Sequence, residues 1–160
     1  MVQLRAVTDQ SPEDDEYSLL LDPLTRLPKR ALLNDRVSIA LARARRNNCA
    51  VGIVVVRTSF RAGLDPKVRA AAVADRAALL TSLVRPDDTL ARLLDATFVV
   101  ICNDIRSQVD LDQVQSRLES GIDDHGRSDA LTATTMITRM AIADDDPQQV
   151  VAVAFRLAST

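Results

Sequence analysis

One stretch of the sequence, CAVGIVVV at residues 49–56, restricts the fold more than any other. It carries no charge, and five of its eight residues are valine or isoleucine. Such β-branched residues are typical of strands. A strand that is apolar at successive positions, rather than at alternate ones, is buried on both faces. We therefore expect residues 49–56 to form the central strand of a covered sheet.

The segments around this run follow a regular order. Apolar residues at helical spacing predict helices over residues 31–47, 67–84 and 108–120, and a last helix that Asp146 caps and Pro147 begins. Further strands are expected at residues 89–94, 97–102 and 131–140. Only Asp95 and Ala96 separate the first two of these strands, which predicts an antiparallel hairpin. The order predicts an α+β fold with a ferredoxin-like βαββαβ core, in which helices pack on a mainly antiparallel sheet.

The composition excludes several classes of function. Twenty basic and 22 acidic residues give a net charge of −2, so we expect no nucleic-acid partner. No apolar run approaches the ~18 residues of a membrane helix. The four glycines are too scattered for a phosphate-binding loop. Cys49 and Cys102 lack metal-ligand spacing and are expected as buried thiols, and His125 as a loop residue. We predict no metal site and no cofactor.

The chain divides into a short lead-in and one domain. Residues 1–20 are polar and include the acidic run EDDE, so we expect a solvated tail or a lead-in turn of helix. Residues 21–160 have the size of a single domain. The first ten residues contain no apolar signal segment, which favours a cytoplasmic location.

Two short motifs point to a known family. The segment DPLTRLPKR at residues 22–30 resembles the opening D-x-L-T-G-L-x-N-R of diguanylate cyclase, or GGDEF, domains, with Arg26 in place of the glycine and Lys29 in place of the asparagine. The hairpin ARLLDATFVV at residues 91–100 resembles the family's A-R-x-G-G-D-E-F-x-x. The order of elements over about residues 22–158 also fits. The alternative is an unrelated α/β sandwich in which DPLTRLP occurs by chance.

The resemblance implies the palm fold of nucleotide cyclases, and a reaction that joins two GTP molecules into cyclic di-GMP. That reaction needs carboxylates to hold divalent cations against the phosphates. Here the family's first-strand metal aspartate falls on Val56, its companion on Thr58, and the carboxylate of the signature on Ala96. The two signature glycines fall on Leu94 and Asp95, whose side chains occupy space that the phosphates need. We expect no catalytic residue and no cyclase activity.

A product-binding motif of the family has a counterpart in this chain. Many members bind cyclic di-GMP at an Arg-x-x-Asp motif just upstream of the hairpin, and Arg85 and Asp88 stand at that spacing. Arginine offers a planar fork of donors to phosphate and to the acceptor edge of guanine, and an aspartate accepts from the N–H groups of guanine. Arg117 lies near the place of a further product-binding arginine. The structural alternative is that Arg85 closes a helix and Asp88 caps the following turn.

The resemblance and the losses together predict a catalytically inactive, GGDEF-like signalling domain. We expect it to bind cyclic di-GMP through Arg85, Asp88 and Arg117, and to form a homodimer or to bind a partner signalling protein. The alternative is a purely structural dimerisation or interaction module that binds no nucleotide. An active cyclase is the third hypothesis, and the missing carboxylates argue against it.

Overall fold

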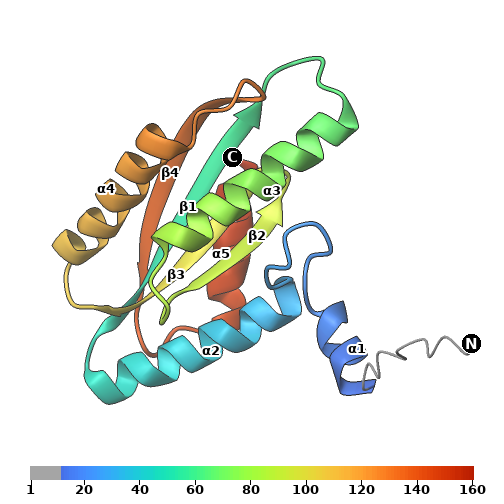
Figure 1. Cartoon of the computed structure of the whole chain (residues 1–160). Coiled ribbons are helices and arrows are strands. Elements are labelled where there is room, and N and C mark those ends of the chain that lie inside the picture. The colour runs from blue at the N-terminus through green and yellow to red at the C-terminus, as the bar shows by residue number, and fades with distance from the viewer. Residues whose placement is uncertain (1–11) are drawn as a thin grey trace, which may run out of the picture.

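The apolar run forms the middle of the sheet. In the computed structural model of the protein, which describes residues 12–160, β1 (Ala50–Phe60) lies between β3 (Thr97–Ile105) and β4 (Leu131–Ala141) and pairs antiparallel with both. β2 (Thr89–Leu94) pairs antiparallel with β3, which gives the strand order β2-β3-β1-β4 (Figure 1). The central position predicted for this run is therefore confirmed.

Long helices cover both faces of the sheet (Figure 1). α2 (Arg30–Asn47) and α5 (Pro147–Ser159) pack on one face, and α3 (Pro66–Leu83) and α4 (Gln108–His125) pack on the other. A short helix, α1 (Pro12–Leu19), precedes α2. Successive residues of β1 enter the two cores in turn: Val55 packs with α2 and α5, whereas Val54 and Val56 pack with α3 and α4. This is why a strand apolar at successive positions suits the centre of the fold.

Local capping sets where two of the helices begin. The Asp65 carboxylate accepts a hydrogen bond from the Lys67 backbone N–H at 2.8 Å, and Pro66 occupies the first turn of α3. Asp146 caps α5 in the same way, again with a proline directly after it. An aspartate cap satisfies a backbone donor that the helix leaves unpaired, and proline lacks the donor altogether. The predicted start of the last helix is thus confirmed.

The predicted fold class is confirmed, with changes at the ends of some elements. β1 continues four residues beyond the predicted strand, to Phe60, because its polar end still pairs with β4. α4 continues to His125, so the expectation that His125 is a loop residue was wrong. The expectation of two buried thiols holds for Cys102, whereas Cys49 is partly exposed just before β1.

The lead-in segment is only partly described. Residues 1–11 of the expected 1–20 tail lie outside the described residues, and α1 occupies most of the rest. Over residues 12–160, no helix combines the length and the apolar character needed to cross a membrane.

Candidate functional site

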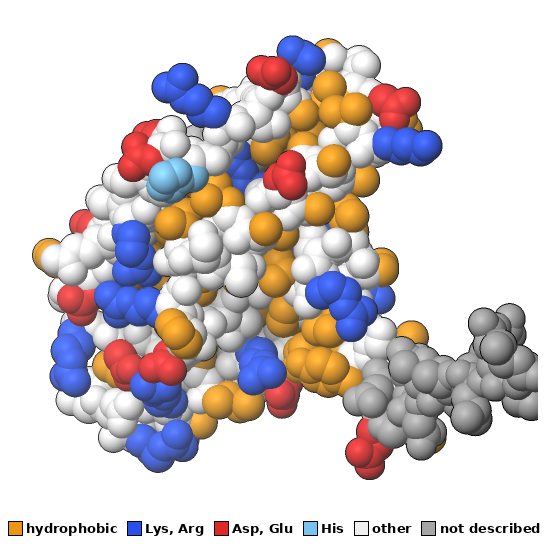
Figure 2. Space-filling view, in the orientation of Figure 1, with side chains coloured by type: hydrophobic (Ala, Val, Ile, Leu, Met, Phe, Trp, Pro, Cys, Tyr) orange, Lys and Arg blue, Asp and Glu red, His pale blue; other side chains and the backbone are white. Residues whose placement is uncertain are grey.

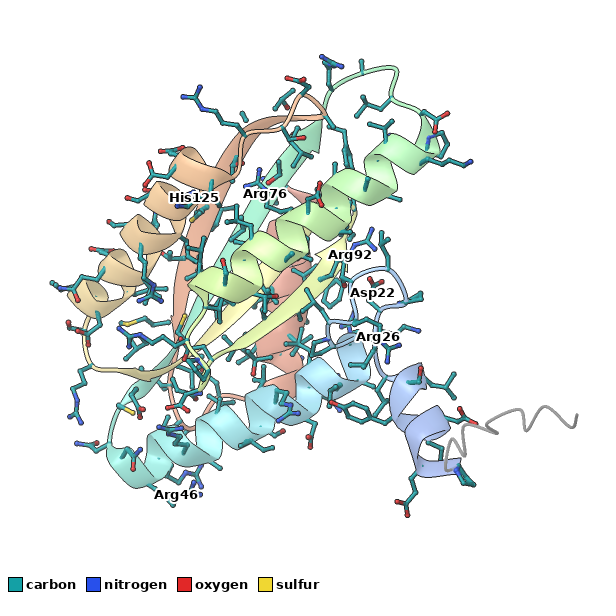
Figure 3. The ribbon with its side chains drawn as sticks, viewed as in Figure 1. Asp22, Arg26, Arg46, Arg76, Arg92 and His125 are labelled. Carbon is teal, nitrogen blue, oxygen red and sulfur yellow. The ribbon has the colours of Figure 1, made fainter. Side chains whose placement is uncertain are left out.

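The two family-like motifs contact each other in the structure. The Asp22 carboxylate accepts hydrogen bonds from the backbone N–H and the hydroxyl of Thr25, at 2.8 and 2.7 Å. Arg92 in β2 donates from Nη1 to both oxygens of the same carboxylate at 3.3 Å (Figure 3). Burial acts to raise the pKa of Asp22, but the Thr25 hydrogen bonds and the Arg92 charge outweigh it, so this pKa lies below its ordinary value. The first motif is therefore connected to the hairpin by an ion pair whose two side chains are each 20% exposed.

Both turns keep a glycine-like backbone although their glycines are replaced. Arg26 and Asp95 stand where the family patterns have glycine, and their φ angles are +61° and +44°. This left-handed region favours glycine, and aspartate tolerates it better than most other residues. The Asp95 carbonyl accepts a hydrogen bond from Arg92 Nε at 2.7 Å, which holds the hairpin turn in place. Both turns therefore have the left-handed backbone that glycine favours, although neither position holds a glycine.

The positions that the resemblance assigns to the family's metal-binding residues lie inside the apolar core. Val56 and Ala96 are both 0% exposed and belong to the core beneath α3 and α4. Thr58 is also buried; its backbone N–H donates to the Ala96 carbonyl at 3.2 Å, and its hydroxyl lies 3.3 Å from that of Thr134. Within residues 12–160 no group of three His, Cys, Asp or Glu side chains is placed to hold a metal ion. The side chains at these positions therefore fit apolar packing and do not fit a cation.

The predicted ligand-binding residues come together at one end of the molecule. Arg85 and Asp88 lie in the turn between α3 and β2, and Arg117 lies on α4. Burial raises the pKa of Asp88 above its ordinary value, while a hydrogen bond from the Asn103 backbone and the charges of Arg85 and Arg117 act to lower it. The same three charges act on the buried Cys102 thiol, whose pKa burial raises to about 12. The fold thus brings Arg117 next to a motif about 30 residues away in the sequence.

Several polar atoms of this cluster lack protein partners. Asp88 Oδ1 accepts from the Asn103 backbone N–H at 2.9 Å, and the Asn103 side chain donates to the Asp87 carbonyl. Arg117 Nε and Asn103 Oδ1 are buried and have no hydrogen-bond partner. Over the described residues, neither Arg85 nor Arg117 forms an ion pair within 4.0 Å. Buried polar groups are normally satisfied, so the cluster retains unused binding capacity.

Basic side chains gather around this cluster. Figure 2 shows Lys and Arg side chains, with a few acidic ones, over the end of the molecule where α2 stops and α4 begins. Arg43 there donates to Asp104 at 2.7 Å and lies 3.8 Å from Asp87. These two carboxylates therefore pair with Arg43, and the only carboxylate whose pKa Arg85 and Arg117 are seen to lower is that of Asp88, among the described residues.

Sequence reasoning missed two residues that the structure brings forward. Asn103 joins the cluster through tertiary contacts from β3, which no motif spacing indicates. Arg76 lies on the apolar stripe of α3 with Val73 and Leu80, and only 4% of its surface is exposed. A charged residue three positions after one core residue and four before the next is a signal that could have singled it out.

Comparison with known proteins supports the fold at low sequence identity. No protein-family model matches the sequence, and no curated protein matches it. A sensory box/GGDEF family protein from Caulobacter crescentus matches with a TM-score of 0.73 at 18% identity, over 87% of this chain and 94% of that chain. The coiled coil and GGDEF domain of DgcB from the same organism, solved with c-di-GMP, matches with a TM-score of 0.73 at 17% identity, over 92% and 82%. A DGC protein from Thermotoga maritima matches with a TM-score of 0.62 at 20% identity, over 86% and 98%.

These neighbours share the arrangement described above. The match extends over 86–92% of this chain and 82–98% of each neighbour. The chain therefore has the fold of GGDEF domains, with helices packed on both faces of a four-stranded antiparallel sheet.

Proposed function

We propose that this chain is a non-catalytic, cytoplasmic signalling domain of the GGDEF fold that binds cyclic di-GMP through Arg85 and Asp88, assisted by Arg117. The observation that carries the proposal is the convergence of these three side chains, with neither arginine in an ion pair within 4.0 Å over the described residues. Arginine without a carboxylate partner is available to a phosphate or to the acceptor edge of a base.

The chemistry of the cluster suits a cyclic dinucleotide. Such a ligand carries two phosphates and two guanines, so it offers acceptors to Arg85 and Arg117 and N–H donors to a carboxylate. Asp88 uses Oδ1 to accept from the Asn103 backbone, and its other oxygen is the acceptor that we assign to guanine. The buried Asn103 Oδ1 supplies a second acceptor nearby. The GGDEF domain of DgcB, whose structure this chain resembles, was solved in complex with c-di-GMP.

The non-catalytic part of the proposal rests on packing. Val56 and Ala96 contribute no oxygen where the family holds cations, and both are buried among apolar side chains. Asp95 adds a negative charge at the turn where triphosphate would approach, which opposes binding rather than assisting it. We therefore expect no turnover of GTP with Mg²⁺ or Mn²⁺.

Isothermal titration calorimetry with cyclic di-GMP tests the binding. Loss of the Arg85 contacts in Arg85→Ala should weaken binding roughly 10- to 100-fold, because hydrogen bonds to charged groups contribute about 1.5–3 kcal/mol. Arg36→Ala is the matched control, since Arg36 is an exposed arginine on α2. Arg85→Lys keeps the charge but loses the fork, so we expect an intermediate affinity. Wild-type protein that gives no binding heat at roughly 100 µM ligand would contradict the proposal.

A dimerisation or interaction module is the second candidate, and one observation favours it. The Asp88 carboxylate fastens the α3–β2 turn to the Asn103 backbone, a structural task that needs no ligand. A neighbour of this fold, SiaD from Pseudomonas aeruginosa, was solved in complex with its activator SiaC. This candidate predicts self-association, or partner binding, that is indifferent to cyclic di-GMP and survives Arg85→Ala. Light scattering with and without the ligand separates the two candidates.

A further inference from the structure

A second arginine, remote from the cluster around Arg85, is buried without a counter-ion. Arg76 on α3 is 4% exposed, and burial lowers its pKa with no carboxylate acting on it. Its Nη2 donates to the Gly126 carbonyl at 3.2 Å, whereas Nη1 is buried with no hydrogen-bond partner. Across residues 12–160, Arg76 takes part in no ion pair within 4.0 Å. A buried charge in this state is unfavourable unless something else neutralises it.

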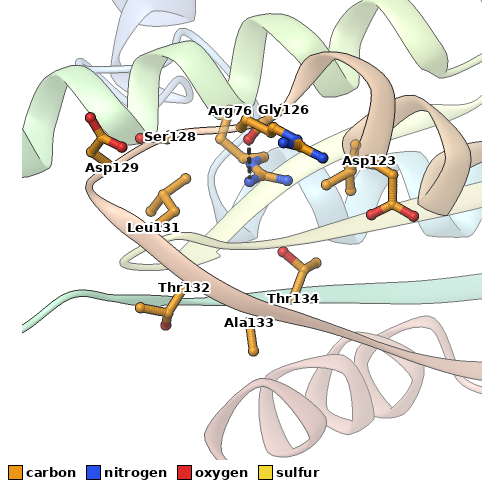
Figure 4. Close-up of a pocket in the computed structure, with 11 residues that line it drawn as sticks. Arg76, Asp123, Gly126, Ser128, Asp129, Leu131, Thr132, Ala133 and Thr134 are labelled. Carbon is orange, nitrogen blue, oxygen red and sulfur yellow. Dashed lines mark hydrogen bonds between the residues drawn. The ribbon is translucent and has the colours of Figure 1, made fainter.

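Arg76 lines a pocket between α3, the end of α4 and β4. The pocket has a volume of about 840 Å³, which lies within the usual range for small-molecule sites. Figure 4 shows the Arg76 side chain in this pocket, with the dashed bond to Gly126 and the side chains of Thr132 and Thr134 on the strand opposite. Arg76 therefore lines one space together with Ser128, Thr132 and Thr134, while the Thr132 hydroxyl donates to the Ser59 carbonyl at 3.1 Å.

The charged side chains of the pocket differ in burial: one lies in its inner part and the others lie at the surface. Arg76 is buried, whereas Arg127, Asp123 and Asp129 are exposed lining residues. The exposed acids do not neutralise Arg76, since neither lies within ion-pair distance of it. Their position favours hydroxyl or amino donors on the outer part of a ligand, while Arg76 favours an anionic group on the inner part.

The bond from Arg76 to Gly126 also has a structural role, but that role uses little of the side chain. Gly126 follows the last residue of α4, so its carbonyl lies among acceptors that a helix end leaves unpaired. Capping this carbonyl occupies one of the five guanidinium N–H donors. A neutral donor would serve equally well as a cap, so capping does not account for a buried positive charge.

We propose that this pocket binds a small organic anion, through a phosphate or carboxylate group held by Arg76. The ligand carries hydroxyl or amino groups that face Asp123 and Asp129. The site lies on the β4 side of β1, whereas the hairpin turn at Asp95 lies on the β3 side. It also shares no residue with the cluster of Arg85, and so it is independent of the proposed cyclic di-GMP site.

Nuclear magnetic resonance of the full chain, labelled with ¹⁵N, tests the proposal. The probes are ribose 5-phosphate and gluconate, titrated separately against sodium chloride at equal ionic strength. We expect saturable shifts of the Arg76 Nε–H signal and of the Gly126 and Arg127 amides. Arg76→Gln should weaken the response roughly tenfold or more, as the loss of charged hydrogen bonds predicts. Arg36→Gln and Arg85→Ala should leave it unchanged.

Each result decides the proposal. A response to ribose 5-phosphate supports a phosphate ligand, and a response to gluconate supports a carboxylate ligand. Absence of saturable shifts with both probes would overturn the site, as would shifts of equal size in Arg76→Gln. The wild-type Arg76 signal reports directly on the pocket, so the test stands even if Arg76→Gln fails to fold. Failure of cyclic di-GMP to bind would leave this result untouched.

Discussion

The ion pair between Asp22 and Arg92 should couple the first motif to the hairpin energetically. Asp22→Asn removes the charge but keeps an oxygen for the Thr25 hydrogen bonds, and Arg92→Met removes the guanidinium but keeps much of the apolar stem. A double-mutant cycle over these two changes isolates the energy of the pair from their separate effects. The cycle is needed because Arg92→Met also removes the hydrogen bond from Arg92 Nε to the Asp95 carbonyl, which holds the hairpin turn.

The size of the coupling follows from the geometry of the pair. Arg92 Nη1 lies 3.3 Å from Asp22 Oδ2, and each side chain is 20% exposed. Exposed ion pairs contribute about 0.2–1 kcal/mol, and hydrogen bonds to charged groups contribute about 1.5–3 kcal/mol. A pair that is mostly buried but still reached by solvent should lie between these ranges. We expect a coupling free energy of about 1–2 kcal/mol.

Urea unfolding, followed by circular dichroism, measures the coupling. With an m-value of roughly 2 kcal/mol/M, the coupling corresponds to about 0.5–1 M in the unfolding midpoint. The matched control is a second cycle between Asp22→Asn and Arg127→Met, because Arg127 is an exposed arginine beyond the end of α4 and forms no ion pair in the described structure. This control should show coupling near zero. A coupling below about 0.3 kcal/mol for Asp22 and Arg92 would refute the reasoning.

The pH dependence gives an independent check on the same pair. The native pKa of Asp22 lies below its ordinary value, so the unfolded chain binds more protons here around pH 4. The ion pair therefore stabilises the fold fully above the unfolded pKa of about 3.9, and this stabilisation is lost as the pH falls through the native pKa. The stability advantage of wild type over Asp22→Asn should shrink accordingly below about pH 4. An advantage that stays constant down to pH 2.5 contradicts this assignment.

Three further predictions concern the core. Gly52→Ala should lower the free energy of unfolding, measured in urea, by about 1–3 kcal/mol, because the added Cβ would lie 2.7 Å from Leu111 Cδ1. An unchanged unfolding midpoint would contradict this prediction, because it would show that the Leu111 side chain moves aside without loss of stability. In native protein a maleimide should modify Cys49 well before Cys102, which is buried and whose pKa burial raises to about 12; the reverse order by mass spectrometry would contradict the packing. Val56→Asp should lower the free energy of unfolding in urea by about 3 kcal/mol or more, because it buries a carboxylate among apolar side chains. A variant as stable as wild type would argue for a polar cleft at this position.

The order of elements could be predicted because several of their boundaries have a local cause. Asp-Pro pairs begin α3 and α5, and the two-residue turn at Asp95 fixes the hairpin. The end of α4 could not be predicted in this way. Gly121 suggests a helix end, yet it lies inside α4, where a Cβ would come within 2.5 Å of the Leu83 side chain. The glycine allows α3 and α4 to approach closely, and this tertiary reason leaves no local pattern.

The candidate site likewise contains some residues that the sequence predicts and others that only tertiary packing reveals. The motif spacing placed Arg85 and Asp88 in one turn, which the structure retains. The contribution of Asn103, and the burial of Arg76 against the end of α4, depend on how β3 and α4 pack, and so only the three-dimensional structure reveals them.

The change at the metal positions and the packing of the core are linked in this fold. In a cyclase-like site, carboxylates at the positions of Val56 and Ala96 would repel each other in an apolar surrounding and would need cations to offset that repulsion. Valine and alanine remove this dependence, because they join the core beneath α3 and α4 without any bound ion. The turn at Asp95 keeps its left-handed backbone because Arg92 and Asp22 hold it from outside the core. Under the function proposed above, the same fold holds its shape without a bound cation, which is what a domain that only binds a ligand or a partner requires.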